Sequence, residues 1–146
     1  MTAFEHTISS TEELSNLYRA PTERVVAKET SILDHGCRDF INQSTFVLVG
    51  TSSPEGKQDV SPRGGPAGFV KVLDEYRLVI PDLNGNNRLD SIRNIIEQGT
   101  IGLLFVIPGL GETLRINGQG CITTDNYILG LFSEALRKPE AAIGVT

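Results

Sequence analysis

Past residue 45 the sequence becomes a series of short runs of β-branched and aromatic residues, each ended within a few positions by turn-forming residues. The first run, residues 45–51, stops at the turn cluster Ser52–Gly56. Short connections between such runs favour an antiparallel, closed or nearly closed barrel over an α/β sheet. Strands are expected at residues 45–51, 57–61, 69–73, 76–80, 100–107 and 113–122, and residues 141–146 read as the start of another.

The sequence before residue 45 has the pattern of helices. Ser10 and Glu13 form a capping box, Pro21 suits the first turn of a second helix, and Asp34 is placed to cap a third. Two further helices are expected at residues 88–98 and 125–137. We therefore expect one domain, residues 1–146, with a helical part at 1–44 and a barrel at 45–146 that lacks its C-terminal element.

Composition and charge exclude several classes of protein. The 146 residues include 13 Lys and Arg against 18 Asp and Glu, and this net charge of −5 argues against nucleic-acid binding. The longest uncharged apolar stretch, residues 101–110, is about half a membrane span, and the N-terminus predicts no signal peptide. Cys37 and Cys121 are too few and too widely spaced for a disulfide framework, which predicts a reducing cytoplasm.

The familiar catalytic and metal-binding motifs are missing from the sequence. His6 and His35 both fall in the helical part, where a surface or structural role is the commoner one. Cys121 reads as a small core residue of a strand, and Cys37 as part of a helix stripe. The sequence therefore assigns no catalytic residue and no metal site.

The segment Val60–Gly68 combines one arginine with small residues and prolines at the end of a strand. Such a segment brings bare backbone close to a ligand while Arg63 offers a planar guanidinium to a phosphate or an electron-rich ring oxygen. A surface loop with an ordinary exposed arginine is an equal alternative.

The segment Ile80–Ser91 ends a strand and then enters a helix through a polar loop. The free N–H groups of that helix start, with Arg88 beside them, make an anion site. Asn86 or Asn87 would also cap the helix without any ligand, which is the alternative interpretation.

Farther along, Arg115 and Asn117 share one strand face, opposite Leu114 and Ile116. They either face solvent or line the same groove as Arg63 and Arg88.

Several of these segments together resemble a known family. The motifs are Ser61–Gly64, Gly68–Val70, Ile80–Asp82 with Gly85–Asn86, Asp90–Ser91, Gly102–Gly109 and Glu112–Gly118. In this order and spacing the chain resembles the pyridoxamine 5′-phosphate oxidase-like, FMN-binding split-barrel family, and more narrowly its bacterial flavin-nucleotide-binding subgroup. The resemblance runs from about Asp34 to Ala142.

The resemblance implies a mainly β fold with flanking helices: a six-stranded antiparallel split barrel of Greek-key type. It also implies a homodimer with FMN in grooves at the subunit interface. The basic pair that the family uses at the phosphate appears here as Asn87–Arg88, with Arg63 as a replacement for the lost charge. The residues implied to bind FMN are Val60, Ser61, Pro62, Arg63, Gly64, Ile80, Pro81, Asn86, Asn87, Arg88, Leu114 and Arg115.

The leading hypothesis is an FMN-dependent oxidoreductase that transfers hydride through the flavin N5, with NAD(P)H or a small organic substrate as its partner. Pyridoxamine phosphate oxidation itself is not expected, because the residues that grip that substrate's phosphate have no counterpart here. The alternative is a protein that stores or senses FMN, or binds haem or a deazaflavin, without turnover. A purely structural dimer with an empty groove is the least favoured hypothesis, because the arginines of these segments point to a ligand.

Overall fold

The computed structural model describes residues 3–26, 28–83, 89–132 and 138–146. It divides into two compact units, residues 1–31 and 32–146, which we describe separately. The first unit holds helices α1 (Thr11–Leu17) and α2 (Glu23–Val26). Ser10 caps α1 as predicted, because its hydroxyl accepts a hydrogen bond from the Glu13 backbone N–H. The Glu13 carboxylate reaches back to Ser9 rather than to Ser10.

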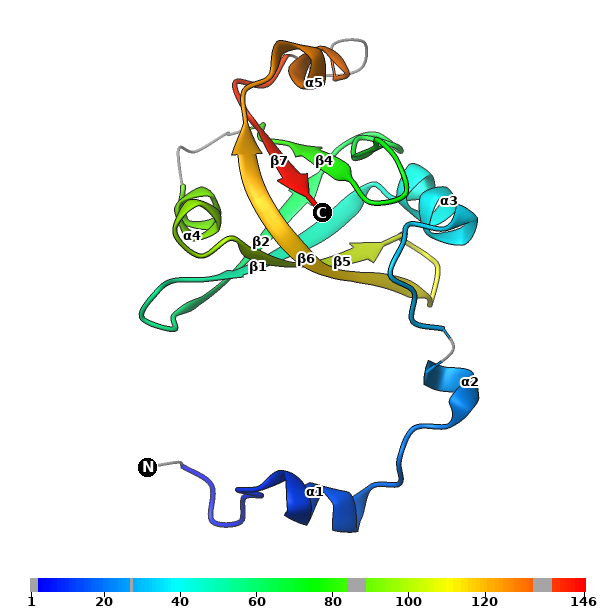
Figure 1. Ribbon diagram of the computed structural model, residues 1–146, viewed down its shortest axis with the longest axis vertical. Helices are drawn as coiled ribbons and strands as arrows, with labels where there is room; N and C mark the ends of the chain where they lie inside the picture. The colour runs from blue at the N-terminus through cyan, green and yellow to red at the C-terminus, as the bar shows by residue number, and fades with distance from the viewer. Residues whose placement is uncertain (1–2, 27, 84–88, 133–137) are drawn as a thin grey trace. The chain divides into compact units, whose positions relative to one another are not determined.

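The second unit contains a sheet with helices around it, which confirms the predicted mainly β fold with flanking helices (Figure 1). Asp34 caps its first helix as predicted, since its carboxylate accepts a hydrogen bond from the Cys37 backbone N–H. The elements are α3 (His35–Gln43), β1 (Phe46–Ser52), β2 (Gln58–Gly64), β3 (Lys71–Val72), β4 (Leu78–Pro81), α4 (Asp90–Gln98), β5 (Thr100–Val106), β6 (Thr113–Thr123), α5 (Asn126–Gly130) and β7 (Ala142–Val145).

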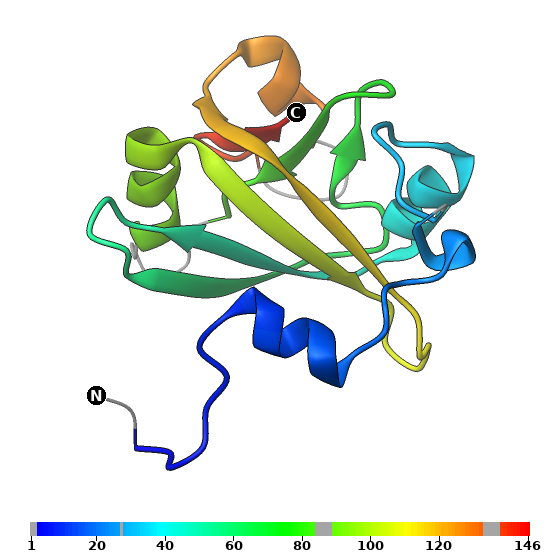
Figure 2. The same cartoon turned by 60° about the horizontal axis from the view of Figure 1, so that its bottom comes forward.

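The sheet is antiparallel, with the strand order β2-β1-β5-β6-β7-β4-β3. The described residues therefore form seven strands and not six, and β2 and β3 are the two edges of a sheet that is not closed into a barrel. The 11-residue β6 joins both halves, because it pairs with β5 up to Gln119 and with β7 from Gly120 onward. Figures 1 and 2 show β6 curving from one half to the other.

The predicted six-strand count is wrong because residues 141–146 provide a full strand. β7 pairs with β6 on one side and with β4 on the other. The strand is therefore internal to the sheet, and its apolar composition follows from this position: Ala142, Ile143 and Val145 are buried.

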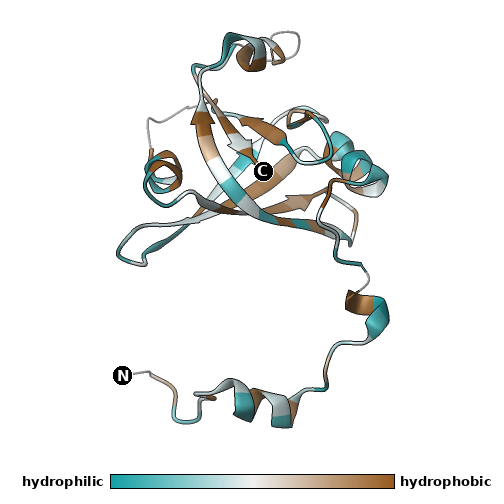
Figure 3. Ribbon diagram, in the orientation of Figure 1, coloured by the Kyte–Doolittle hydropathy of each residue, from teal (hydrophilic) through white to brown (hydrophobic). Residues whose placement is uncertain are grey.

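The core is built by alternation along the strands and by the apolar faces of α3 and α4. On β1, Val47, Val49 and Thr51 face inward and are buried, whereas the residues between them are half-buried. Figure 3 shows the apolar colouring concentrated on the strands of the second unit. The main core comprises Leu33, Ile41, Val47, Val49, Phe69, Val70, Leu78, Ile80, Ile95, Ile101, Leu103, Phe105, Ile143 and Val145. A second cluster comprises Val79, Ile128, Leu129, Phe132 and Ala142.

Several element boundaries differ from the prediction. β2 continues through Pro62 to Gly64, a position where proline is tolerated because β2 is an edge strand. The hairpin before β4 is wider than the expected Asp74–Glu75 turn, because the Leu73 N–H donates to the Arg77 carbonyl. Helix α4 begins at Asp90, and its N-cap residue Leu89 makes no side-chain cap.

The predicted caps Asn86 and Asn87 lie outside the described residues. The helix expected at 125–137 is shorter in the structure, because α5 ends at Gly130 with Leu131 as its C-cap. In the described part of the chain, none of the helices has both the length and the apolar character needed to cross a membrane.

Candidate functional site

A row of polar side chains lies on the inner face of the edge strand β2. The register pairs Asp59, Ser61 and Arg63 with Thr51, Val49 and Val47 of β1, which all face the interior. Side chains at every second position of a strand share a face, so these three polar groups point inward together. An edge strand has no neighbouring strand on one side, which leaves room there for partners from other elements.

Arg63 is held by two partners within this row. Its Nη1 donates to Oδ1 of Asp82 over 2.7 Å, and its Nε donates to Oγ of Ser61 over 3.1 Å. The Arg63 and Asp82 side chains are 16% and 14% exposed, so the ion pair is largely shielded from water while remaining reachable. Asp82 directly follows β4, and its backbone N–H donates to the Ala141 carbonyl over 3.1 Å. The pair therefore connects the edge strand β2 to the end of β4.

Helix α4 is attached to the other end of the same strand. The hydroxyl of Ser91, which is 3% exposed, donates to Oδ2 of Asp59 over 3.0 Å. One turn later, Nδ2 of Asn94 donates to Oγ1 of Thr51 over 3.0 Å. These bonds fix the first two turns of α4 against β1 and β2. We call Asp59, Ser61, Arg63, Asp82 and Ser91 the β2 polar row.

The β2 polar row brings together the two segments that the sequence singled out. Asp82 contacts Arg63 at one end of β2, and Ser91 contacts Asp59 toward the other end. The two sides of the loop between β4 and α4 are thus both attached to β2. Asn86, Asn87 and Arg88, predicted to hold an anion, lie outside the described residues.

The other predicted site residues of β2 and β6 are divided between the two faces of the sheet. Val60, Pro62 and Gly64 alternate with the polar row and are exposed on the outer face, where Val60 is 67% exposed. Arg115 is also exposed on that outer face, whereas Leu114 points inward and packs against the core. The fold of the single chain does not bring Arg115 together with Arg63, because they occupy opposite faces of the sheet.

Ile80 and Pro81 occupy a third environment, the buried ladder between β4 and β7. Ile80 pairs with Ile143, Pro81 pairs with Ala142, and all four residues are buried. Their side chains therefore serve the core. Their contribution to the site is to place Asp82, the next residue, opposite Arg63.

The outer face of the sheet is apolar in its middle. The register aligns Pro62, Leu48, Leu104 and Arg115 in one row across β2, β1, β5 and β6. Beside that row, a surface hollow of about 330 Å³ includes the paired glycines Gly50 and Gly102. Another hollow, of about 450 Å³, lies between the turn before β4 and the start of α5; it is lined by Leu73, Arg77, Asp125, Asn126, Tyr127 and Ile128.

Three members of the polar row, namely Asp59, Asp82 and Ser91, are not among the site residues predicted from the sequence. Asp82 was inside the second segment but had no assigned partner. The available signal for Asp59 was its period-two spacing with Ser61 and Arg63, which places all three on one strand face. The pairing with Asp82 and Ser91 depends on contacts between distant segments, which the sequence pattern does not report.

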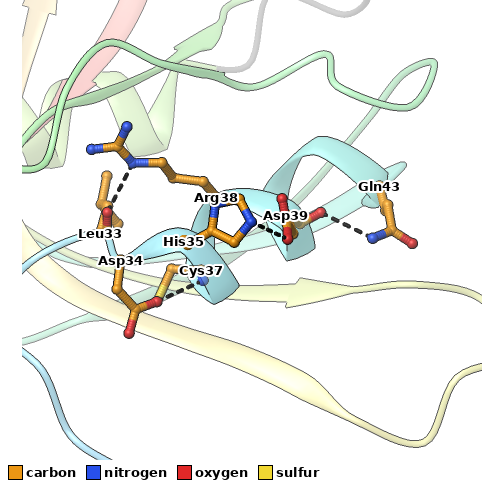
Figure 4. A network of polar contacts seen from close by, with 7 residues as sticks. All are labelled: Leu33, Asp34, His35, Cys37, Arg38, Asp39 and Gln43. Carbon is orange, nitrogen blue, oxygen red and sulfur yellow. Dashed lines mark hydrogen bonds and ion pairs between the residues drawn. The ribbon is translucent and has the colours of Figure 1, made fainter.

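The cysteine and histidine of α3 belong to a separate polar network (Figure 4). Burial, reinforced by the hydrogen bond with the Asp34 carboxylate, raises the pKa of the Cys37 thiol. The Cys37 backbone N–H in turn lowers the pKa of Asp34. His35 pairs with Asp39 at 3.3 Å on an exposed helix face, and Arg38 Nε donates to the Leu33 carbonyl. A thiol with a raised pKa is a poor nucleophile, which agrees with a structural role for Cys37.

The groups of the polar row are hydrogen-bonding groups, and both of its carboxylates already accept a hydrogen bond within the row. The row contains two carboxylates and one guanidinium, and the guanidinium is already paired. Within the described ranges, no three His, Cys, Asp or Glu side chains gather as metal ligands would. The arrangement is suited to hydrogen bonding a ligand with defined donors and acceptors.

Comparison with known proteins agrees with this architecture. Residues 33–142 match the family model described as Pyridoxamine 5′-phosphate oxidase. HupZ from Group A Streptococcus superposes with a TM-score of 0.62 at 17% identity, covering 78% of this chain and 93% of HupZ.

Two further solved structures are similar in the same way. A protein from Lactobacillus delbrueckii, described as a putative pyridoxamine 5′-phosphate oxidase, has a TM-score of 0.62 at 16% identity, over 82% of this chain and 93% of that one. The FAD binding protein from Mycobacterium smegmatis has a TM-score of 0.52 at 12% identity, over 80% and 91%. At these identities the likeness concerns the fold. No curated protein matches the sequence.

Proposed function

Because the chain belongs to the pyridoxamine 5′-phosphate oxidase family, we propose that it is an FMN-binding flavoprotein that works as an oxidoreductase. The observation that carries the proposal is the shielded Arg63, oriented by Ser61 and Asp82 at the open edge of the sheet. The shared fold with a protein described as binding FAD supports a flavin as the ligand.

The β2 polar row fits the ring of a flavin better than its phosphate. A phosphate near Arg63 would meet the carboxylate of Asp82, which already neutralises the guanidinium, and Asp59 adds a second negative charge on the same strand face. The uncharged ring carbonyls of a flavin do not face this repulsion. We therefore propose that Arg63 binds the flavin ring, and that Arg88 binds the phosphate together with the backbone of Asn86 and Asn87.

FMN, when bound, supplies hydride transfer at its N5 atom. The contribution of the chain is to bind and orient the ring through Arg63 and Ser61 and to limit water around the shielded Arg63–Asp82 pair. We propose NAD(P)H or a small organic molecule as the hydride partner. A reducing, cytoplasmic location is part of the same proposal, supported by the free thiols of Cys37 and Cys121.

We propose that the working form is a homodimer whose subunits meet through the outer sheet face. The apolar row of Pro62, Leu48 and Leu104, together with the largely exposed Val60, is the kind of surface that a second copy would cover. Arg115, at the end of that row, would then approach the partner subunit. This supports a role for Arg115 in a shared site rather than beside Arg63 of its own subunit.

A second candidate is a binding protein that stores or senses FMN, a deazaflavin or haem without turnover. The observation in its favour is that the side chains of the polar row hydrogen-bond to one another, which makes a fixed recognition surface.

The test is to purify the full chain, record its absorption spectrum and titrate it with FMN by fluorescence quenching. Flavin bands and saturable FMN binding support the flavoprotein proposal, and a Soret band with no FMN binding contradicts it. Anaerobic NADH or NADPH then separates the two candidates. Bleaching of bound FMN supports the oxidoreductase, and unchanged absorption with both donors favours the binding protein. Light scattering with and without FMN tests the dimer.

A further inference from the structure

We propose that Asp82 and Arg63 act as one acceptor–donor pair that selects the pyrimidine-type edge of a flavin or deazaflavin ring, with Asp82 accepting the ring N3–H. This inference rests on the proposed function and identifies the residue that would decide which class of cofactor the site takes.

The first step is the geometry of the pair. Among the described residues, Arg63 and Asp82 share a single hydrogen bond, from Nη1 to Oδ1, over 2.7 Å. A guanidinium carries five N–H donors, and a carboxylate has two acceptor oxygens. A monodentate pair therefore leaves further donor capacity on the guanidinium and further acceptor capacity on the carboxylate, both within one ion pair.

The second step is that both groups are held in place before any ligand arrives. Ser61 accepts from Arg63 Nε over 3.1 Å, which sets the direction of the guanidinium fork. The backbone N–H of Asp82 donates to the Ala141 carbonyl, which attaches Asp82 to the strand ladder of β4 and β7. Groups fixed in this way lose little conformational entropy when they bind a ligand.

The third step is charge. An anionic group placed against the pair is repelled by Asp82, and a cationic group is repelled by Arg63. A neutral edge with an acceptor next to a donor satisfies both partners at once. With side chains only 14–16% exposed, these hydrogen bonds are also less weakened by water than bonds at an open surface.

The fourth step is the match to a cofactor class. The pyrimidine part of an isoalloxazine presents a carbonyl, an N3–H and a second carbonyl in sequence, and a deazaflavin keeps the same edge. Haem has carboxylates and no free ring N–H in its iron-bound form, so it offers Asp82 no donor. The pair thus favours flavins and deazaflavins over haem.

The experiment compares FMN with FMN methylated at N3, which replaces the proposed donor by a methyl group. For the unmodified full chain we expect the methylated analogue to bind at least about tenfold more weakly, the range for a lost hydrogen bond to a charged group. In Asp82→Ala this penalty should fall below about threefold. The control Glu55→Ala removes an exposed carboxylate from the turn before β2, outside the polar row, and should keep the full penalty.

A merely structural role for Asp82 would weaken both ligands equally and leave their ratio unchanged, so the ratio is the decisive readout. Equal affinity of the unmodified chain for both ligands overturns the inference while leaving the FMN proposal intact. Absence of any FMN binding overturns both. If Asp82→Ala does not fold, Asp82→Asn replaces it; the penalty must again fall, because the acceptor is then uncharged.

Discussion

Asn94 of α4 donates a hydrogen bond to the hydroxyl of Thr51 in β1 over 3.0 Å, and Thr51 is only 4% exposed. In Asn94→Ala the buried hydroxyl loses this partner, and a loss of about 1–2 kcal/mol in the free energy of unfolding is expected. Urea denaturation followed by circular dichroism measures it. The control is Arg93→Ala, an exposed neighbour on the same helix that should change stability by less than about 0.5 kcal/mol. Equal effects of the two variants would contradict an anchoring role for Asn94.

The ion pair of Arg63 and Asp82 should behave as a coupled unit in folding. Arg63→Ala leaves the Asp82 carboxylate largely shielded from water and without its counter-charge, and we expect a loss of about 2–4 kcal/mol. The double variant Arg63→Ala/Asp82→Ala should be more stable than the sum of the single changes predicts. Chemical denaturation of all four proteins gives the coupling energy, and strict additivity would show that the pair does not stabilise the fold.

The glycine that follows β2 should not tolerate a side chain. A Cβ on Gly65 would lie 2.8 Å from Cβ of Phe69, which is buried, so Gly65→Ala forces a shift in a packed region. Overpacking of this kind costs about 1–3 kcal/mol. Gly111→Ala is the matched control, because a Cβ there meets nothing within 4 Å. Thermal melts of both variants check the expectation, which fails if Gly65→Ala melts at the wild-type temperature.

The two cysteines should differ in reactivity and in pH dependence. Burial and the Asp34 hydrogen bond raise the pKa of Cys37, so at any pH below that value less of it is the reactive thiolate. Cys121 is exposed. Iodoacetamide at pH 8 should therefore label Cys121 several-fold faster than Cys37, and labelling of Cys37 should continue to accelerate as the pH rises. Mass spectrometry of Cys37→Ser and Cys121→Ser measures each thiol alone; faster labelling of Cys37 would refute the assignment.

Arg88 is the residue that we expect to bind the flavin phosphate. Arg88→Glu removes a charge-assisted contact and adds repulsion, so FMN affinity should fall at least about tenfold. Fluorescence titration provides the measurement, and riboflavin, which lacks the phosphate, should bind both proteins equally. Lys57→Glu reverses a charge at an exposed position before β2 and serves as the control. An unchanged FMN affinity in Arg88→Glu would remove Arg88 from the phosphate site.

Local patterns in the sequence were sufficient for most of the fold. Ser10 and Asp34 cap their helices as predicted, because a cap depends on residues only three positions apart. The strand runs were found because alternating burial produces a period of two, and β1 shows this period clearly. The number of strands was wrong because a short apolar run such as residues 142–145 shows its partners only in the folded sheet.

The candidate site was predictable as two segments but not as a set of contacts. Arg63 was selected because arginine among small residues and prolines is an unusual choice for a plain strand end. Its partner Asp82 comes from 19 positions away, and Asp59 meets Ser91 across 32 positions. No local periodicity encodes such pairs. The separation of Arg63 and Arg115 onto opposite faces likewise follows from the register of four strands, which depends on the whole sheet.

The position of β7 between β4 and β6 has a consequence for how the protein is made. Leu78 of β4 pairs with Val145 of β7, which lies more than sixty residues later in the chain. β4 therefore has no neighbour on its β7 side until the C-terminal segment has been synthesised. Half of the sheet thus cannot assemble in the order in which the ribosome releases it. Until the segment at 142–145 has emerged, one side of β4 and residues 120–123 of β6 lack their β7 partner, and unpaired strand backbone of this kind promotes aggregation.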